Sequence, residues 1–180
     1  MNKTKLIALC GICGAVAVVC LVALSYVKWF ALALAVVAAV VVCCPQMLDG
    51  KYVWYSVATY FAATVVGVLL GNVVYVAPVA IFAMPCAIWK LHCRHKQAKG
   101  KQWQVFKWLG NYLLAAVALV ATALLMSALM PATWQNFVQN KWFVLIVAAS
   151  TIVGTVAYDK LLDGAIYWTK NVLQKSKFGQ

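Results

Sequence analysis

The sequence predicts an all-α integral membrane protein with six transmembrane helices, N-in/C-in, in a single transmembrane domain over residues 1–180. Two observations predict this fold class. First, 66% of the 180 residues are hydrophobic, and the apolar runs match the roughly 20 residues that a helix needs to cross a bilayer. Second, the lysines gather between these runs and not inside them. The length suits one domain.

The orientation rests on one basic stretch, Lys90–Lys107. It carries six of the fifteen Lys and Arg residues, including the only arginine, and it has no acid. Cations between two membrane-length segments are typical of cytoplasmic loops, so we expect a cytoplasmic basic loop at residues 91–104. A nucleic-acid partner is excluded by composition, because so hydrophobic a chain has no soluble body to present a basic patch.

The first two spans form a predicted hairpin. The first, over residues 6–27, contains no charge and is too long for the apolar region of a signal peptide. The second, over residues 30–47, follows almost directly after Lys28 and Trp29 and contains Pro45 near its end. With so short a connection, the two helices are expected to be antiparallel.

The next apolar tract must fold back on itself. It runs for 38 residues, from Tyr52 to Trp89, which would make a helix of nearly 60 Å. The central breaker, Gly71-Asn72, predicts spans at 52–71 and 73–90 with a tight external turn. Pro78 and Pro85 predict a kink in the second of these.

The last two spans are predicted at residues 105–130, before Pro131, and at 142–158. Beyond them, apolar and charged residues alternate with a helical period, which predicts an amphipathic C-terminal extension over 159–180 at the cytoplasmic surface. This layout places thirteen of the fifteen Lys and Arg residues inside and leaves only Lys28 and Lys141 outside. Five or seven spans would scatter these charges, so the count favours six.

Two groups of residues are candidates for binding. Gly11 and Ala15, four residues apart in the first span, make a small-residue face that lets another helix approach closely; the alternative is packing within the bundle. A second group, expected on the external half, combines aromatic and amide side chains as small-molecule pockets do; the alternative is that they anchor helices at the membrane interface. This second group comprises Trp29, Asn72, Tyr75, Trp134 and Asn136.

Catalysis is not expected. No ionisable group is predicted deep within a span, and we expect Asp159 and Asp163 to pair locally near Lys160 or to face water. Without clustered acids or an activated nucleophile, acid–base and covalent chemistry lack their groups. His92 and His95 could share a helical face, but adjacent cations and the lack of further ligands argue against a metal site. The sequence therefore predicts no catalytic residue, metal or cofactor.

The layout resembles the S-components of energy-coupling factor transporters, which capture micronutrients in prokaryotic membranes and dock on a transmembrane subunit driven by two ATPases. Gly50-Lys51 before a Tyr-rich span, the stretch Phe82–Lys90 (FAMPCAIWK) and the stretch Ala157–Leu162 (AYDKLL) are similar to an uncharacterised group of small Gram-positive membrane proteins with that organisation. Ala-Met stands before Pro85 where the group has Gly-aromatic. Nickel and cobalt S-components use an N-terminal Met-His clamp, whereas position two here is Asn2.

The resemblance implies a substrate-capturing subunit of a micronutrient or small-solute uptake transporter in a bacterial plasma membrane. Its expected partners are membrane lipids, the solute, and a transmembrane coupling subunit with ATPases that would contact Gly11 and Ala15. The alternative is a non-transporting structural or regulatory membrane protein that recruits partners through its basic cytoplasmic face.

Overall fold

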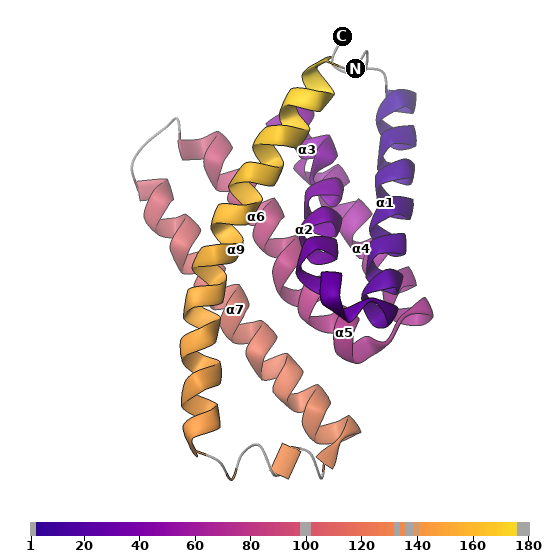
Figure 1. Cartoon of the computed structure of the whole chain (residues 1–180). Helices are drawn as coiled ribbons and strands as arrows, with labels where there is room; N and C mark the ends of the chain where they lie inside the picture. Colours follow the sequence, from indigo (N-terminus) through magenta and orange to yellow (C-terminus); the bar gives the residue numbers. More distant parts are fainter. Residues whose placement is uncertain (1–2, 98–101, 132–133, 136–138, 140, 176–180) are drawn as a thin grey trace.

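The computed structural model confirms the prediction of an all-helical chain (Figure 1). It describes residues 3–97, 102–131, 134–135, 139 and 141–175. The short helices η1 (Lys28–Phe30) and η2 (Gly50–Tyr52) connect longer elements. The longer elements are α1 (Lys3–Tyr26), α2 (Ala31–Val42), α3 (Cys44–Leu48), α4 (Val53–Leu70), α5 (Val73–Pro78), the π-helix η3 (Val79–Ala83), α6 (Met84–Gln97), α7 (Gln102–Leu129) and α9 (Lys141–Lys175).

Five helical stretches are long and apolar enough to cross a membrane. They are Lys3–Tyr26, Gly50–Leu70, Val73–Lys96, Gln102–Leu129 and Leu145–Leu173. The predicted second span differs, because α2 has only 12 residues and covers about 18 Å. The chain turns at Cys43 and continues as α3, with Pro45 in the first turn of that helix. The helices therefore support a membrane location, while the sixth crossing stays a prediction.

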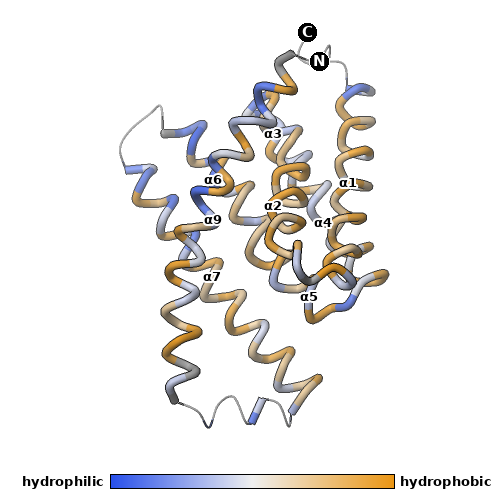
Figure 2. Tube along the Cα trace, in the orientation of Figure 1, coloured by the Kyte–Doolittle hydropathy of each residue, from blue (hydrophilic) through white to orange (hydrophobic). Residues whose placement is uncertain are grey.

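Charged and apolar segments are separated along the molecule. The N-terminal end of α1, α3 and the C-terminal end of α9 lie at one end, and α5 and the C-terminal end of α7 lie toward the other (Figure 1). Hydrophilic residues concentrate in the half nearer the first end, whereas the other half is mostly apolar (Figure 2). This is the separation that the sequence predicts for a cytoplasmic and an external end.

Proline and glycine shape the segments that line the interior. The π-helix η3 directly follows Pro78, as expected where a proline disturbs the helical hydrogen-bond ladder. Gly67 of α4 packs on α1, and a Cβ atom at this position would lie 2.6 Å from Cδ1 of Leu21. The core forms where α1, α2 and α4 meet η3 and α6, and Leu21, Val42 and Met84 are fully buried there.

The last two long helices pack only at one end. In the described part of α7, only Asn111, Ala115 and Ala118 are buried, and the described side chains of α9 before Thr155 are all at least partly exposed. The half of each helix near the connection between them extends away from the other helices (Figure 1).

The basic connection is shorter than predicted. α6 continues to Gln97 and α7 begins at Gln102, so most of the expected loop 91–104 is helical. The predicted sixth span and the described part of the C-terminal extension are one continuous helix, because α9 runs without interruption to Lys175; residues 176–180 of the extension lie outside the described residues.

Candidate functional site: a buried ion-pair network beside an apolar cavity

The structure corrects the prediction for Asp159. Instead of pairing near Lys160 or facing water, its side chain is only 2% exposed and lies 2.8 Å (Oδ1) from Nζ of Lys90. Its other oxygen, Oδ2, lies 3.0 Å from Nζ of Lys107. The buried positions Thr155, Asp159, Leu162 and Ile166 follow the three- and four-residue spacing of one helical face. This face turns Asp159 toward α6 and α7.

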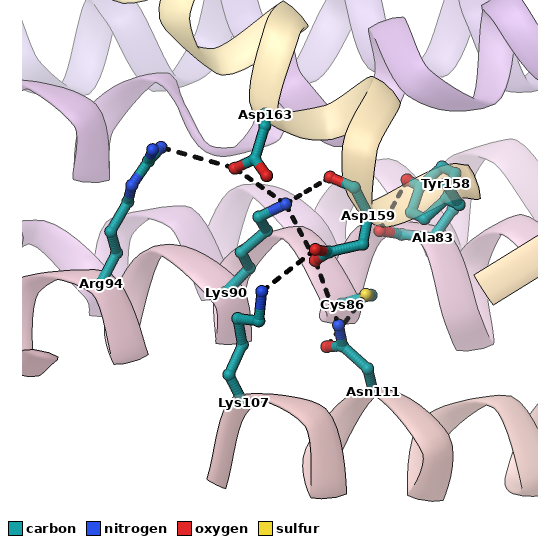
Figure 3. A network of polar contacts seen from close by, with 9 residues as sticks. All are labelled: Ala83, Cys86, Lys90, Arg94, Lys107, Asn111, Tyr158, Asp159 and Asp163. Carbon is teal, nitrogen blue, oxygen red and sulfur yellow. Dashed lines mark hydrogen bonds and ion pairs between the residues drawn. The ribbon is translucent and has the colours of Figure 1, made fainter. Parts of the chain in front are cut away.

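The contacts extend into a network that joins three helices (Figure 3). Nζ of Lys90 also lies 2.9 Å from Asp163 and donates a hydrogen bond to the main-chain carbonyl of Asp159. Nη1 of Arg94 lies 3.7 Å from Asp163. Nδ2 of Asn111 donates to Oδ1 of Asp159 over 3.3 Å. Asp159 thus receives contacts from both α6 and α7.

Helical spacing explains why the network forms where it does. Each helix supplies residues four positions apart: Lys90 and Arg94 on α6, Lys107 and Asn111 on α7, and Asp159 and Asp163 on α9. Side chains at this spacing lie one above the other on the same helical face. Three such faces therefore meet along about one turn of each helix.

The network links to the π-helix through neighbouring side chains. Cys86 Sγ donates to Oδ1 of Asn111 over 3.3 Å, and the Tyr158 hydroxyl donates to the carbonyl of Ala83 over 3.0 Å. The Tyr158 ring also packs against Phe82, with ring centroids 5.4 Å apart. The end of η3 is thereby attached to α9 next to Asp159.

Beside this attachment lies an apolar cavity of about 430 Å³ between α2, η3, α7 and α9. Three threonines, Thr122, Thr151 and Thr155, are among its lining residues. Each threonine hydroxyl donates to a carbonyl of its own helix, four residues earlier. Their oxygens therefore keep lone pairs that can accept hydrogen bonds. The cavity can hold a mainly apolar molecule.

A second apolar cavity, of about 540 Å³, lies between α4, α6 and α7. Trp89 and Gly110 line it together, and a Cβ atom at Gly110 would be 2.0 Å from Nε1 of Trp89. Nε1 donates to the carbonyl of Phe106 over 3.3 Å. Glycine is therefore needed at this position for the indole to lie against α7. His92, weighed as a metal ligand in the sequence, lines this cavity and stacks on Trp89.

The external candidate residues are not gathered into any of the cavities described here. Trp29 is 97% exposed and Tyr75 is 36% exposed. The Asn72 side chain accepts a hydrogen bond from N of Val74 and so caps α5. Trp134 is partly buried. Asn136 lies outside the described residues, and a binding role for this group stays a prediction.

The small-residue face of α1 is exposed. Gly11 and Ala15 are both open to the surroundings, and a Cβ atom at Gly11 would meet nothing within 4 Å. Gly14, by contrast, faces α4, where its Cβ would lie 3.7 Å from Thr59. The contacts in the structure therefore leave Gly11 and Ala15 available to a helix from outside, and docking stays a prediction.

Sequence reasoning missed the network and placed binding elsewhere. The available signal was the four-residue spacing of the Asp159–Asp163, Lys90–Arg94 and Lys107–Asn111 pairs.

Comparison with known proteins finds no family model, no curated protein and no solved structure that matches the chain. The resemblance to S-components therefore stays a prediction.

Proposed function

We propose that the chain is the substrate-capturing membrane subunit of a small-solute uptake system of the energy-coupling factor type. In this proposal it crosses the bacterial plasma membrane six times, with both termini in the cytoplasm, and α2 and α3 together form the second crossing. The observation that carries the proposal is the cavity of about 430 Å³ between α2, η3, α7 and α9. Its volume lies within the ~300–1,000 Å³ of small-molecule sites.

The lining indicates the class of solute. Most of the wall is aliphatic or aromatic, with the hydroxyl groups of Thr122, Thr151, Thr155 and Tyr158 set into it. Each of these hydroxyl protons is already donated to a main-chain carbonyl. A solute that matches this wall is small and mainly apolar.

The ion-pair network holds the helices together at one end of the cavity, and the helices are less constrained at the other end. It ties α9 to α6 and α7 at Asp159, whereas the halves of α7 and α9 beyond the cavity have little packing. Helix segments with few buried contacts open at low free energy. Movement of these two halves relative to α2 and η3 would admit the solute from the external side or from the bilayer.

Energy would come from separate subunits. The sequence contains no nucleotide-binding glycine loop, and the exposed Gly11 and Ala15 offer a face for a transmembrane partner. Co-purification from native membranes tests this part of the proposal. Recovery with a transmembrane subunit and ATPases would support it, and recovery of the chain alone would favour the structural or regulatory alternative.

A cavity-filling pair of variants tests the capture site. Gly154 lines the cavity, and a Cβ atom there would meet nothing within 4 Å, so Gly154→Leu fills the space without a backbone clash. Gly164→Leu is the matched control, because Gly164 lies on the same helix with equally open space. Both changes replace a glycine with a better helix former, so both should stabilise the helix by the same amount, about 1 kcal/mol.

The readout is native mass spectrometry of gently purified protein, which reports a retained solute as an added mass. We expect the wild type and Gly164→Leu to retain the solute and Gly154→Leu to lose it. If all three proteins retain the same bound mass, the solute lies elsewhere and this cavity is not the capture site.

A further inference from the structure

A third cavity lies next to the ion-pair network and has a different character. It measures about 490 Å³ and lies between α6 and α9. Its apolar wall is formed by Met47, Leu91 and Ile166, all of which are buried. Two cationic side chains, Arg94 and Lys170, lie on its lining as well. The apolar wall is buried, whereas both cations are exposed, the Arg94 side chain to 53%.

The charges around this cavity do not balance. In the described part of the network, Lys90, Arg94 and Lys107 face only two carboxylates, Asp159 and Asp163. The two lysines have the closer contacts, at 2.8 to 3.0 Å. Arg94 has only one contact, at 3.7 Å to an oxygen that Lys90 already approaches to 2.9 Å. One positive charge is left over within the network.

Lys170 adds to this surplus. It lies on the same face of α9 as Asp163 and Ile166, seven and four residues earlier, and no ion pair is found for it among the described residues. Arg94 and Lys170 therefore line one cavity. The carboxylate that Arg94 contacts, that of Asp163, is shared with Lys90. An anion in this cavity would lie beside both cations.

Two other polar side chains, His95 and Asn171, line the cavity beside the two cations. His95 lines the cavity, and its Nε2 lies 3.3 Å from the carbonyl of Gln46. Because a carbonyl only accepts, Nε2 carries a proton in this contact, and a neutral ring then has no second N–H to donate to an anion. Gly50 lies against the His95 ring, and a Cβ atom at this glycine would be 2.9 Å from Cγ of His95. Asn171, with an amide that can donate, also lines the cavity.

We propose that this cavity binds a phosphate group. Arginine offers a planar pair of donors that match phosphate oxygens, and lysine adds a point charge. Basic pockets between membrane helices suit the headgroups of anionic lipids, and a free phosphate or phosphorylated solute has the same chemistry. The apolar wall formed by Met47, Leu91 and Ile166 favours a ligand that also carries an acyl chain. The site is independent of the solute cavity and of the proposed transport function.

A matched pair of charge-removing variants tests the site. Lys170→Gln removes a cation from the cavity, and Lys160→Gln removes one from an exposed position ten residues earlier on the same helix, outside the lining. The full chain is purified in a zwitterionic detergent. It is titrated with short-chain phosphatidylglycerol, short-chain phosphatidylcholine or inorganic phosphate, and bound probe is measured by native mass spectrometry. A thermal melt of each variant verifies that it is folded.

We expect phosphatidylglycerol to bind the wild type more tightly than phosphatidylcholine does. Loss of one charge-assisted contact in Lys170→Gln should weaken this binding about tenfold, whereas Lys160→Gln should stay within about twofold of the wild type. Binding that inorganic phosphate cannot displace identifies a lipid, and displacement by inorganic phosphate identifies a soluble phosphate ligand. Equal weakening in both variants would show general attraction to a basic protein and overturn the proposal. Equal binding of the two lipids with no phosphate binding would do the same.

Discussion

Replacement of Asp159 by Asn is the sharpest test of the ion-pair network. The change keeps the size of the side chain and removes its charge. Lys90, whose side chain is 3% exposed, keeps the Asp163 carboxylate at 2.9 Å but loses the one at 2.8 Å. Lys107, 18% exposed, loses the one carboxylate found for it in the described part of the chain, at 3.0 Å. Two cations are thus left with one carboxylate between them.

The expected cost follows from the depth of the charges. Removing one partner of a buried ion pair costs about 3–5 kcal/mol, because the other charge stays buried without compensation. The lower end applies here, since Lys90 keeps a second carboxylate and Lys107 can reach water. A loss of about 3 kcal/mol in a chain of this size corresponds to a melting temperature lower by roughly 6–12 °C.

Asp163→Asn is the matched control. It makes the same chemical change one helical turn away, at a side chain that is 38% exposed. Exposed ion pairs are worth about 1 kcal/mol or less, so its melting temperature should fall by no more than about 4 °C. The assay is thermal unfolding of the detergent-solubilised protein followed by tryptophan fluorescence. Equal losses in the two variants would refute the reasoning that burial makes Asp159 the centre of the network.

Two further predictions concern packing beside the cavities. Gly110→Ala places a Cβ atom 2.0 Å from Nε1 of Trp89. We expect the indole to move, its hydrogen bond to the carbonyl of Phe106 to break, and the free energy of unfolding to fall by about 1–3 kcal/mol. A red shift of tryptophan emission reports the movement of the indole, and a thermal melt reports the loss of stability. Tyr158→Phe removes the hydroxyl that donates to the carbonyl of Ala83 and should cost about 1–3 kcal/mol, since a buried acceptor is left without its partner.

Each of these variants has a control on the same protein. Gly154→Ala makes the same change as Gly110→Ala where a Cβ meets nothing within 4 Å, and it should leave the melting temperature unchanged or slightly raised. Tyr167→Phe removes a hydroxyl from an exposed ring and should be nearly neutral. If Gly110→Ala is as stable as Gly154→Ala, the close approach of Trp89 is wrong; if both tyrosine variants melt alike, the bond to Ala83 has no energetic role.

The helical class and several boundaries could be predicted because they depend on local signals. The break at Gly71-Asn72 is confirmed, with α4 ending at Leu70 and α5 beginning at Val73. Membrane-length apolar runs in the other regions likewise follow from composition. The short α2 was missed although Pro45 gave a signal: the proline lies in the first turn of α3, and α2 ends before it at Val42.

The network could not be predicted, because it depends on which helix faces meet. Asp159 lies 52 residues from Lys107 and 48 from Asn111 along the chain. Each helix shows its own four-residue spacing, but no local signal says that these three faces point at one another. The apolar cavity could not be predicted for the same reason: it lies where α7 and α9 meet α2 and η3, which is a property of packing.

The buried contact between Lys90 and Asp159 also has a consequence for biosynthesis. Its partners are 69 residues apart, so the ribosome delivers the cation well before the carboxylate. Lys90 is the last residue of the predicted fourth span, so without a counter-charge its long side chain can reach toward the headgroups. Newly inserted α6 is therefore expected to lie with Lys90 near the lipid surface. When α9 is inserted, the ion pair with Asp159 should move Lys90 to its final position. A chain that stops before Asp159 should remain in this unfinished state and be a substrate for membrane quality control.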